Sequence, residues 1–565
     1  MGLPLSVQTA AAQTHNAAAA MQLPADQKAY KAAMASPTPD GQIAALQAFV
    51  HDFPDSKRVG AARLKVLRLL LGVHPDRVRQ IHALAKTMIH DSGAGIDRAN
   101  EENEVSYELA EAMPSGIDLK SAEKWAADAV TQSTLPLYTA YLRHSYANYK
   151  IPAPSATEIQ QSFEQTLAAD LQTLADVYFH EGKLDAAAAA LDRTKGFDPH
   201  AIEPELGAIL LSRGQIADAR HHDAEALDDL ERAEVYGGLN AQGMSVLHRL
   251  YAQTHGGGTA GMDAEIDALY RKLIPAAFTP APHTAPPTGR TVLLELYTGS
   301  GCAPCVGADL ALDGVLQAYP RSEVVALSFD QHIPEPDPLA NPETVARAGF
   351  YHIGGTPTAF IDGQSPGFVG GERSNSQKSF AALAADLDKQ LNTPSGVTLK
   401  LEASAAPGHT VAVNATVRIT DPETLHKLLA TSDGKAPDAK MPRLVLNLAL
   451  VQQDVRYSGE NGIRFHSMVV RSLARPSAEG FPVAVTGESH ASFSFDPAAV
   501  SAALGKYLAA YAQYNDRFGV VHFLSTDTSL TGPLAVAAWV EDPATHNVLQ
   551  AAFVPLNATT QEAAR

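Results

Sequence analysis

The sequence predicts a multidomain protein in which an all-α region is followed by an α/β domain and then by a mainly β, sandwich-like domain. Three successive patterns support this division. The first half is rich in Ala and Leu, with apolar residues at helical spacing; the middle alternates strand-like and helix-like segments; the last part alternates apolar with polar residues. The predicted boundaries are residues 1–26 for a disordered start or signal-peptide remnant, 27–275 for the helices, 276–290 for a linker, 291–392 for the α/β domain, 396–558 for the β-rich domain and 559–565 for a tail.

The helical part contains one internal repeat. The segment that starts at Leu174 is echoed by the one that starts at Leu206, and each is expected to hold a helix, a turn at Gly182 or Gly214, and a second helix. The shift of 32 residues is close to the roughly 34 of tetratricopeptide repeats, and the region resembles a solenoid of that family. The resemblance implies a groove that binds a protein or peptide partner.

Proline marks the boundary between the helices and the rest of the chain. Pro275, Pro280, Pro282, Pro286 and Pro287 cannot continue a helix and favour an extended spacer. The strands predicted directly after the spacer are 291–297, 324–329, 358–361 and 367–370. The helices predicted among them are a stripe of apolar residues over 312–319 and the segments 343–352 and 375–391. The strands predicted after these are 411–419, 444–450, 535–540 and 548–554, with one helix at 497–517. The stripe of Tyr507, Tyr511 and Tyr514 on that last helix is expected in the core.

The composition argues against some classes of partner and location. A formal net charge of −19 disfavours nucleic acid and anionic membrane surfaces as partners, since both require a basic patch. No run of about twenty apolar residues predicts a membrane span. Residues 1–13 form a short apolar run with Ala10, Ala11 and Ala12 at its end, which resembles the end of a secretory signal and predicts a periplasmic or secreted protein. The alternative is a disordered Ala-rich segment.

The chain has two cysteines, Cys302 and Cys305, and they follow the first predicted strand of the α/β domain. Two cysteines placed at random would show this spacing on the order of one time in a few hundred. Two thiolates cannot complete the four ligands of a structural zinc site. The pair therefore predicts a dithiol/disulfide centre that needs no metal or other cofactor.

The expected helix start gives the two sulfurs different roles. Unpaired amides and the helix dipole would stabilise a thiolate at Cys302, which is then the nucleophile. Cys305 lies one turn further along and would resolve the mixed disulfide that Cys302 forms with a substrate. Pro304 is tolerated in the first turn, where its missing N–H breaks no hydrogen bond.

Two further elements complete the predicted site. Residues 354–363 contain Thr356 and Pro357 before a short strand, and Glu295 is an acid within the apolar strand that precedes the cysteines. A buried carboxyl at Glu295 could pass protons to and from Cys305, and an acid that faces another domain is the alternative. Residues 291–392, with the cysteine pair and the Thr-Pro loop, resemble secreted bacterial thioredoxin-like proteins.

The resemblance implies that Pro357 is a cis-proline whose loop faces the cysteines and offers backbone groups to an extended substrate. Two positions depart from the thioredoxin pattern. Glu295 lies seven positions before Cys302, where thioredoxin has six, and Gly301 replaces the aromatic residue that usually precedes the first cysteine.

Three hypotheses for function follow. The leading one is a thiol–disulfide oxidoreductase, more a reductant or isomerase than an oxidant, that acts on protein or small-molecule disulfides while the helical repeats bind a protein partner. The second is a copper(I) chaperone in which His332 joins the two thiolates. The third is a non-catalytic interaction scaffold.

Overall fold

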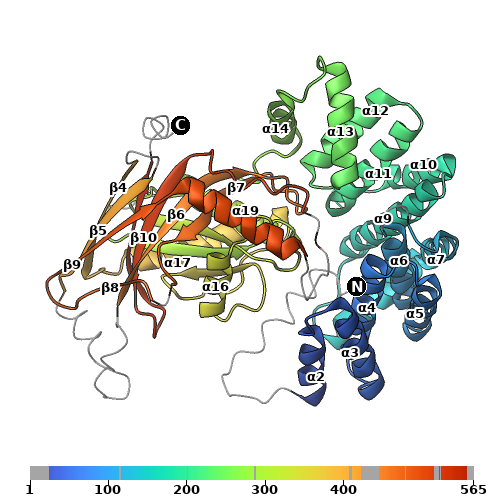
Figure 1. Cartoon of the computed structure of the whole chain (residues 1–565), viewed down its shortest axis with the longest axis horizontal. Helices are drawn as coiled ribbons and strands as arrows, with labels where there is room; N and C mark the ends of the chain where they lie inside the picture. Colours follow the sequence, from blue (N-terminus) through green and yellow to red (C-terminus); the bar gives the residue numbers. More distant parts are fainter. Residues whose placement is uncertain are drawn as a thin grey trace. The chain divides into compact units, whose positions relative to one another are not determined.

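The computed structural model describes residues 24–112, 116–199, 201–284, 288–405, 410–421, 444–477, 479–513, 521 and 523–556. By its internal contacts the chain divides into a helical unit, Met1–Leu269 with Ala512–Leu524, and a sheet unit, Tyr270–Tyr511 with Ser525–Arg565 (Figure 1). The predicted start of the chain up to residue 23, Pro286 and Pro287 of the linker, Tyr514, and the predicted tail lie outside the described residues.

The helical unit confirms the predicted all-α region. Its helices are α2 (Ala25–Met34), α3 (Pro39–Asp52), α4 (Val59–Val73), α5 (Val78–Asp91), α6 (Ile96–Ala110), α7 (Leu119–Gln132), α8 (Leu135–Asn148), α9 (Ala156–His180), α10 (Leu184–Asp192), α11 (Leu206–Ala219), α12 (Asp223–Val235), α13 (Ala241–Thr254) and α14 (Met262–Leu273), with 3₁₀ turns η2 (Arg193–Gly196) and η3 (Glu203–Glu205). The last residues of α14 belong to the sheet unit.

Local sequence signals set the start of the longest helix. Ser155 caps α9 by accepting a hydrogen bond from the amide of Glu158, whose carboxylate in turn accepts one from the amide of Ser155. The helix then buries Leu167, Leu171 and Leu174 at helical spacing, because neighbouring helices pack around it.

The internal repeat is only partly reproduced. Gly182 lies in the turn between α9 and α10 and has a φ of 74°, as expected. Gly214 lies inside α11 instead, so the turn predicted there is wrong; the chain turns near His221, after α11 ends. A Cβ on Gly214 would come within 2.6 Å of the Leu230 side chain, so this glycine permits the close approach of α12.

The sheet unit contains two sheets. The strands are β1 (Val292–Thr298), β2 (Val324–Asp330), β3 (Thr358–Ile361), β4 (Val397–Ala405), β5 (Val411–Ile419), β6 (Val445–Arg456), β7 (Phe465–Leu473), β8 (Phe481–Pro482), β9 (Glu488–Phe495), β10 (Leu534–Glu541) and β11 (Val548–Pro555). The large sheet has the order β11-β10-β6-β7-β2-β1-β3, with β8 beside β6, and the small antiparallel sheet has the order β4-β5-β9. Strands β1, β2 and β7 are parallel; the other pairs are antiparallel.

The large sheet joins segments that the sequence assigned to separate domains. Strand β7 pairs with β2 in parallel, so strands of the β-rich segment continue the sheet of the α/β segment. The small sheet packs its apolar face on β6 and β10 and forms one core with them. The predicted strand at 367–370 is absent from the described residues; Ile361 forms only an isolated bridge with Gln364 there.

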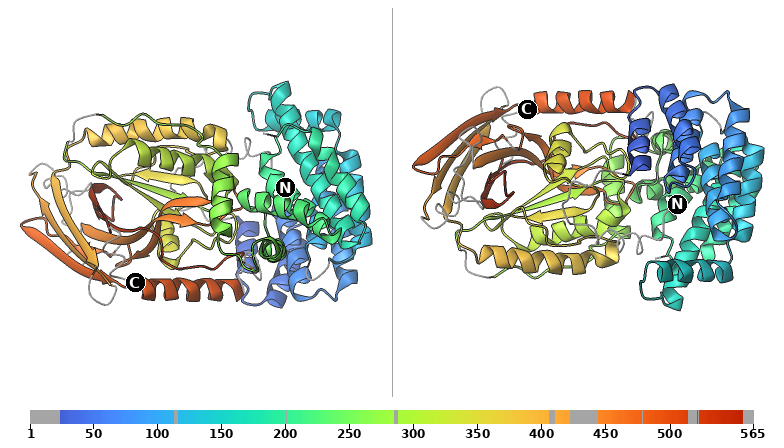
Figure 2. Two further views of the ribbon diagram at one scale, coloured as in Figure 1. Left: turned by 90° about the horizontal axis from the view of Figure 1, so that it is seen from above. Right: turned by 90° about the horizontal axis from the view of Figure 1, so that it is seen from below.

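Helices cover both faces of the large sheet near β1. The remaining helices are α15 (Val306–Ala318) after the 3₁₀ turn η4 (Ala303–Cys305), α16 (Pro342–Phe350), α17 (Ser376–Leu391) after η5 (Arg373–Asn375), and α19 (Pro497–Gln513). Helices α15 and α17 pack on the face that carries Val292, Leu294 and Leu296, as Figure 2 illustrates, and α16 packs on the opposite face. No helix of the described residues is long and apolar enough to span a membrane.

Candidate functional site

The two cysteines form a disulfide at the junction of β1 and α15. The Cys302–Cys305 bond joins residues whose Cα atoms are 5.2 Å apart. Cys305 closes the turn η4 and stands immediately before the first residue of α15, so the pair occupies the start of a helix as the sequence predicts. Both cysteines are completely buried. The burial of Cys302 differs from what its predicted role as the attacking nucleophile requires.

The Thr-Pro loop lies against the cysteine pair. The Thr356–Pro357 peptide bond is cis. The hydroxyl group of Thr356 lies 3.3 Å from Sγ of Cys302 and 2.9 Å from the carbonyl oxygen of Ile333. The structure thus brings Thr356, which is 54 positions away in the sequence, into contact with the first cysteine.

Gly370 and Gly371, at and just after the end of the segment 367–370 that the sequence predicts as a strand, pack against the cysteine turn. The amide of Gly371 donates to the carbonyl oxygen of Pro304, and the amide of Gly307 donates to the carbonyl oxygen of Gly371, both at 2.7 Å. Gly370 has a φ of 135°, and a Cβ there would lie 2.5 Å from Cγ of Pro357. The Gly-Gly dipeptide was the signal for this close approach, because only glycine permits it.

Glu295 lies on the opposite face of the sheet from α15. Side chains alternate along a strand, and Leu294 and Leu296 face α15, so Glu295 points to the α16 side. Its carboxylate is fully buried and accepts hydrogen bonds from Arg347 at 2.7 and 3.1 Å and from the hydroxyl group of Tyr351 at 2.8 Å. The structure therefore does not bring Glu295 together with the cysteines in the way the sequence analysis expected.

Three aspartates lie within or beside the segment 298–309 that carries the cysteines. Asp309 follows Cys305 by four residues, one helical turn, and accepts a hydrogen bond from the hydroxyl group of Thr298 at 2.7 Å. Asp330 pairs with Thr298 in the register of β1 and β2. Asp337 accepts a hydrogen bond from the amide of Ser300 at 2.6 Å. The one-turn spacing after Cys305 was a sequence signal for Asp309 that the analysis missed.

Burial raises the pKa of each of these aspartates, to about 6 for Asp337. It raises the pKa of Asp309 to about 8, although part of that side chain remains accessible to solvent. Burial, together with the charges of Asp337 and Asp309, raises the pKa of Asp330 well above its usual range, and Arg471 counteracts this only in part. Neither carboxylate oxygen of Asp330 has a hydrogen-bond partner among the described residues, and its side chain is 1% exposed.

The tip of the β6–β7 hairpin, residues 457–464, covers the segment just before Cys302. The amide of Asn461 donates to the carbonyl oxygen of Ser300 at 3.0 Å, and its side-chain Nδ2 donates to the carbonyl oxygen of Gly299 at 3.3 Å. A Cβ on Gly459 would lie 2.7 Å from the carbonyl oxygen of Ser300. We call residues 457–464 the hairpin tip.

His332, the third ligand of the copper hypothesis, has both ring nitrogens engaged. Nδ1 accepts a hydrogen bond from the amide of Asp337 at 3.0 Å, and Nε2 lies 2.8 Å from the hydroxyl group of Tyr507. Burial lowers the pKa of His332 to about 4. Tyr511 stacks on the ring at 3.8 Å, so Tyr507 and Tyr511 are half-buried partners of this loop, not core residues. The described residues contain no group of three or more His, Cys, Asp or Glu arranged to hold a metal ion.

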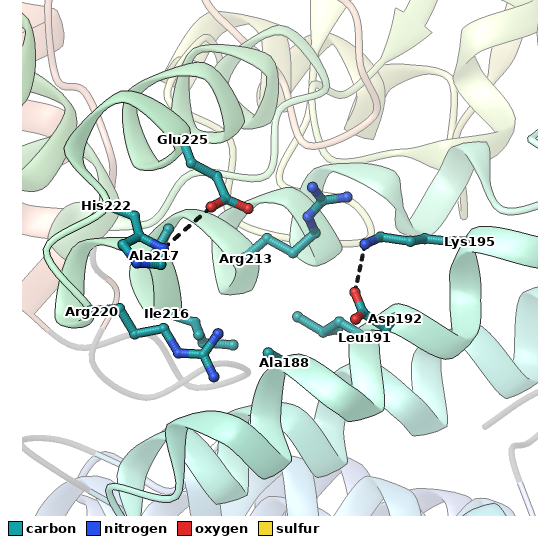
Figure 3. A pocket seen from close by; sticks show the side chains of 10 residues that line it. All are labelled: Ala188, Leu191, Asp192, Lys195, Arg213, Ile216, Ala217, Arg220, His222 and Glu225. Carbon is teal, nitrogen blue, oxygen red and sulfur yellow. Dashed lines mark ion pairs between the residues drawn. The ribbon is translucent and has the colours of Figure 1, made fainter.

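The helical unit has a surface pocket between α10, α11 and α12 (Figure 3). Ion pairs join Lys195 to Asp192 at 2.7 Å and His222 to Glu225 at 3.5 Å along its sides. The pocket is lined by Ala188, Leu191, Ile216 and Ala217 together with Asp192, Lys195, Arg213, Arg220, His222 and Glu225. It combines apolar surface with charged groups of both signs.

Comparisons with known proteins give no match: no family model fits the chain, and neither the curated proteins nor the solved structures yield a significant similarity. The chemistry of the site therefore rests on the residues themselves. A disulfide at this spacing is consistent with redox activity.

Proposed function

We propose that the protein is a thiol–disulfide oxidoreductase of thioredoxin-like architecture that reduces disulfides in polypeptide substrates. The observation that supports this best is the contact between the Thr356 hydroxyl group and Sγ of Cys302, beside a cis Thr356–Pro357 bond. A reversible disulfide at a helix start, with a backbone loop against its first sulfur, has the parts that thiol–disulfide exchange with an extended peptide requires.

The reaction runs in two exchanges from the dithiol form. The thiolate of Cys302 attacks one sulfur of the substrate disulfide, a mixed disulfide forms, and the first substrate thiolate leaves. Cys305 then loses its proton, attacks Sγ of Cys302 and releases the second substrate thiolate, so the Cys302–Cys305 disulfide forms as the substrate gains two electrons. An external thiol or dithiol reductant returns the pair to the dithiol form.

Asp309 is the proposed proton acceptor for Cys305. It lies one turn after Cys305, and burial raises its pKa to about 8, near the working pH that favours general base catalysis. Its partial exposure gives the proton a route to solvent. Glu295 is excluded from this role in the proposal because Arg347 and Tyr351 hold it on the other face of the sheet.

Access to Cys302 requires movement. The side chain has no exposed surface in the disulfide form, and the hairpin tip is fastened to residues 299 and 300. We propose that the tip moves away before a substrate disulfide reaches Cys302.

The helical unit is proposed to recruit the protein that carries the disulfide. Helices that pack in succession, as in solenoid proteins, form surfaces that bind peptides, and the pocket between α10, α11 and α12 offers apolar surface and charge in one place. A periplasmic or secreted location is part of the same proposal, since exported proteins meet oxidised substrates.

Insulin reduction tests the function. The protein charged with dithiothreitol should reduce insulin catalytically, and Cys302→Ser should not. Cys305→Ser should accumulate a mixed disulfide with the substrate because the resolving thiol is gone. Absence of turnover, together with stoichiometric binding of Cu(I), would refute the oxidoreductase and favour the copper hypothesis.

A further inference from the structure

Two glutamates flank the residue that precedes the first cysteine. A Cβ on Gly301 would lie 3.0 Å from Oε2 of Glu460 and 3.3 Å from Cβ of Glu335. Glu460 belongs to the hairpin tip and Glu335 to the loop between β2 and α16, and both side chains are exposed. Both glutamates therefore border the residue just before Cys302 in the disulfide form.

Neither glutamate of this pair forms an ion pair among the described residues. Partial burial of the Glu460 carboxyl group, together with the negative charges of Glu335 and Asp337, raises the pKa of Glu460 to about 7. Within the hairpin tip, the guanidinium of Arg464 donates a hydrogen bond to the hydroxyl group of Ser458 at 2.6 Å, and Arg271 lies over the ring of Phe465 at 5.1 Å. Above that pKa, Glu460 adds its negative charge beside Gly301 to a chain whose formal net charge is −19.

We propose that Glu335 and Glu460 select substrates whose disulfide is flanked by lysine or arginine. The inference rests on the proposed oxidoreductase function and names its substrate class. A cationic side chain beside the substrate cysteine gains charge-assisted hydrogen bonds to these carboxylates, whereas an acidic one is repelled. Attraction between opposite charges also raises the rate of productive encounter.

Glu460 lies next to a residue that holds the hairpin tip against the segment before Cys302. Glu460 is the neighbour of Asn461, whose amide fastens the hairpin tip to Ser300. A cation that pairs with Glu460 therefore engages the same stretch of chain that has to move before Cys302 can react.

The test uses three disulfide-containing peptides of equal length that carry Lys, Gln or Glu on both sides of each cysteine. With the full-length reduced protein we expect kcat/KM to fall in the order Lys, Gln, Glu, with at least about a tenfold difference between the extremes at about 0.01 M salt. The difference should shrink at about 1 M salt, where the Debye length is about 3 Å.

Substitutions test whether the charge preference arises from Glu335 and Glu460. The double variant Glu335→Gln with Glu460→Gln should lose most of the preference, while Glu479→Gln, an exposed glutamate in the turn after β7, should keep it. Equal rates for the three peptides, or a preference that survives the double substitution, would overturn this inference and leave the oxidoreductase intact. Reduction of none of the peptides and no reduction of insulin would refute the proposed function, and the inference with it.

Discussion

Arg347 holds together a fully buried cluster of charges, and its replacement gives the most quantitative prediction. The guanidinium donates two hydrogen bonds to Glu295, at 2.7 and 3.1 Å, and two to Glu541, at 3.0 and 2.8 Å. All three side chains are 0% exposed. Arg347→Met removes the cation and leaves two carboxylates in the core, so we expect the free energy of unfolding to fall by about 3–5 kcal/mol at neutral pH.

A triple variant distinguishes the effect of the two unpaired carboxylates from the effect of lost packing around residue 347. The triple variant Arg347→Met, Glu295→Gln and Glu541→Gln removes the two carboxylate charges as well. It should recover most of the lost free energy of unfolding, because replacing a whole buried ion cluster by uncharged residues often changes stability little. The loss in the single variant should also be smaller at acid pH, since protonation then neutralises the stranded carboxylates.

Urea unfolding of the full chain, followed by circular dichroism and by Trp539 fluorescence, measures both effects. Trp539 reports on this cluster directly, since its indole N–H donates to Glu541 at 3.1 Å. Lys378→Met on the exposed side of α17 is the matched control and should change the free energy of unfolding by less than about 0.5 kcal/mol. A loss below about 1 kcal/mol for Arg347→Met, or no recovery in the triple variant, would refute the assigned role of the cluster.

Three further predictions concern the site. Asp309→Asn should slow resolution of the mixed disulfide by about two orders of magnitude in stopped-flow assays. Glu295→Gln should leave that rate within about threefold of wild type. The reverse result would restore Glu295 as the proton carrier. Gly370→Ala should lower the free energy of unfolding by about 1–3 kcal/mol, because the φ of Gly370 is 135° and a Cβ there would meet Pro357. Gly354→Ala is the control, since open space surrounds that position. Equal effects of the two substitutions would contradict the argument. Asn461→Ala should speed reduction of the disulfide by dithiothreitol roughly fivefold or more, since two side-chain hydrogen bonds of the hairpin tip are lost; an unchanged rate would show that the tip does not limit access.

Local pattern was sufficient for much of the fold. Helical spacing of apolar residues located the helical region, and alternation located β5 and the β10–β11 hairpin. The placement of the cysteines between a strand and a helix was also visible, because both flanking elements have strong periodicity. Gly214 shows the limit of this approach, since a glycine that permits helix contact has the same local signature as a glycine in a turn.

The partners of each strand could not be obtained from local pattern. Strand β7 lies beside β2, although more than a hundred residues separate them, and no periodicity encodes which edge of a sheet a later strand will join. The sequence therefore suggested a separate domain where the structure has a continuous sheet.

The sequence by itself determined that two cysteines lie three positions apart between a strand and a helix, and this spacing predicts redox chemistry at Cys302 and Cys305. Only the tertiary structure decided which acid accompanies them. Strand alternation places Glu295 and Leu294 on opposite faces of the sheet. Which of these faces receives α15 depends on tertiary packing. In the structure α15 packs on the Leu294 face, so that Glu295 pairs with Arg347 on the other face and Asp309 lies on the side of the cysteines. The burial of Cys302 was likewise decided by tertiary structure, since Thr356, which contacts its sulfur, lies 54 residues away in the sequence.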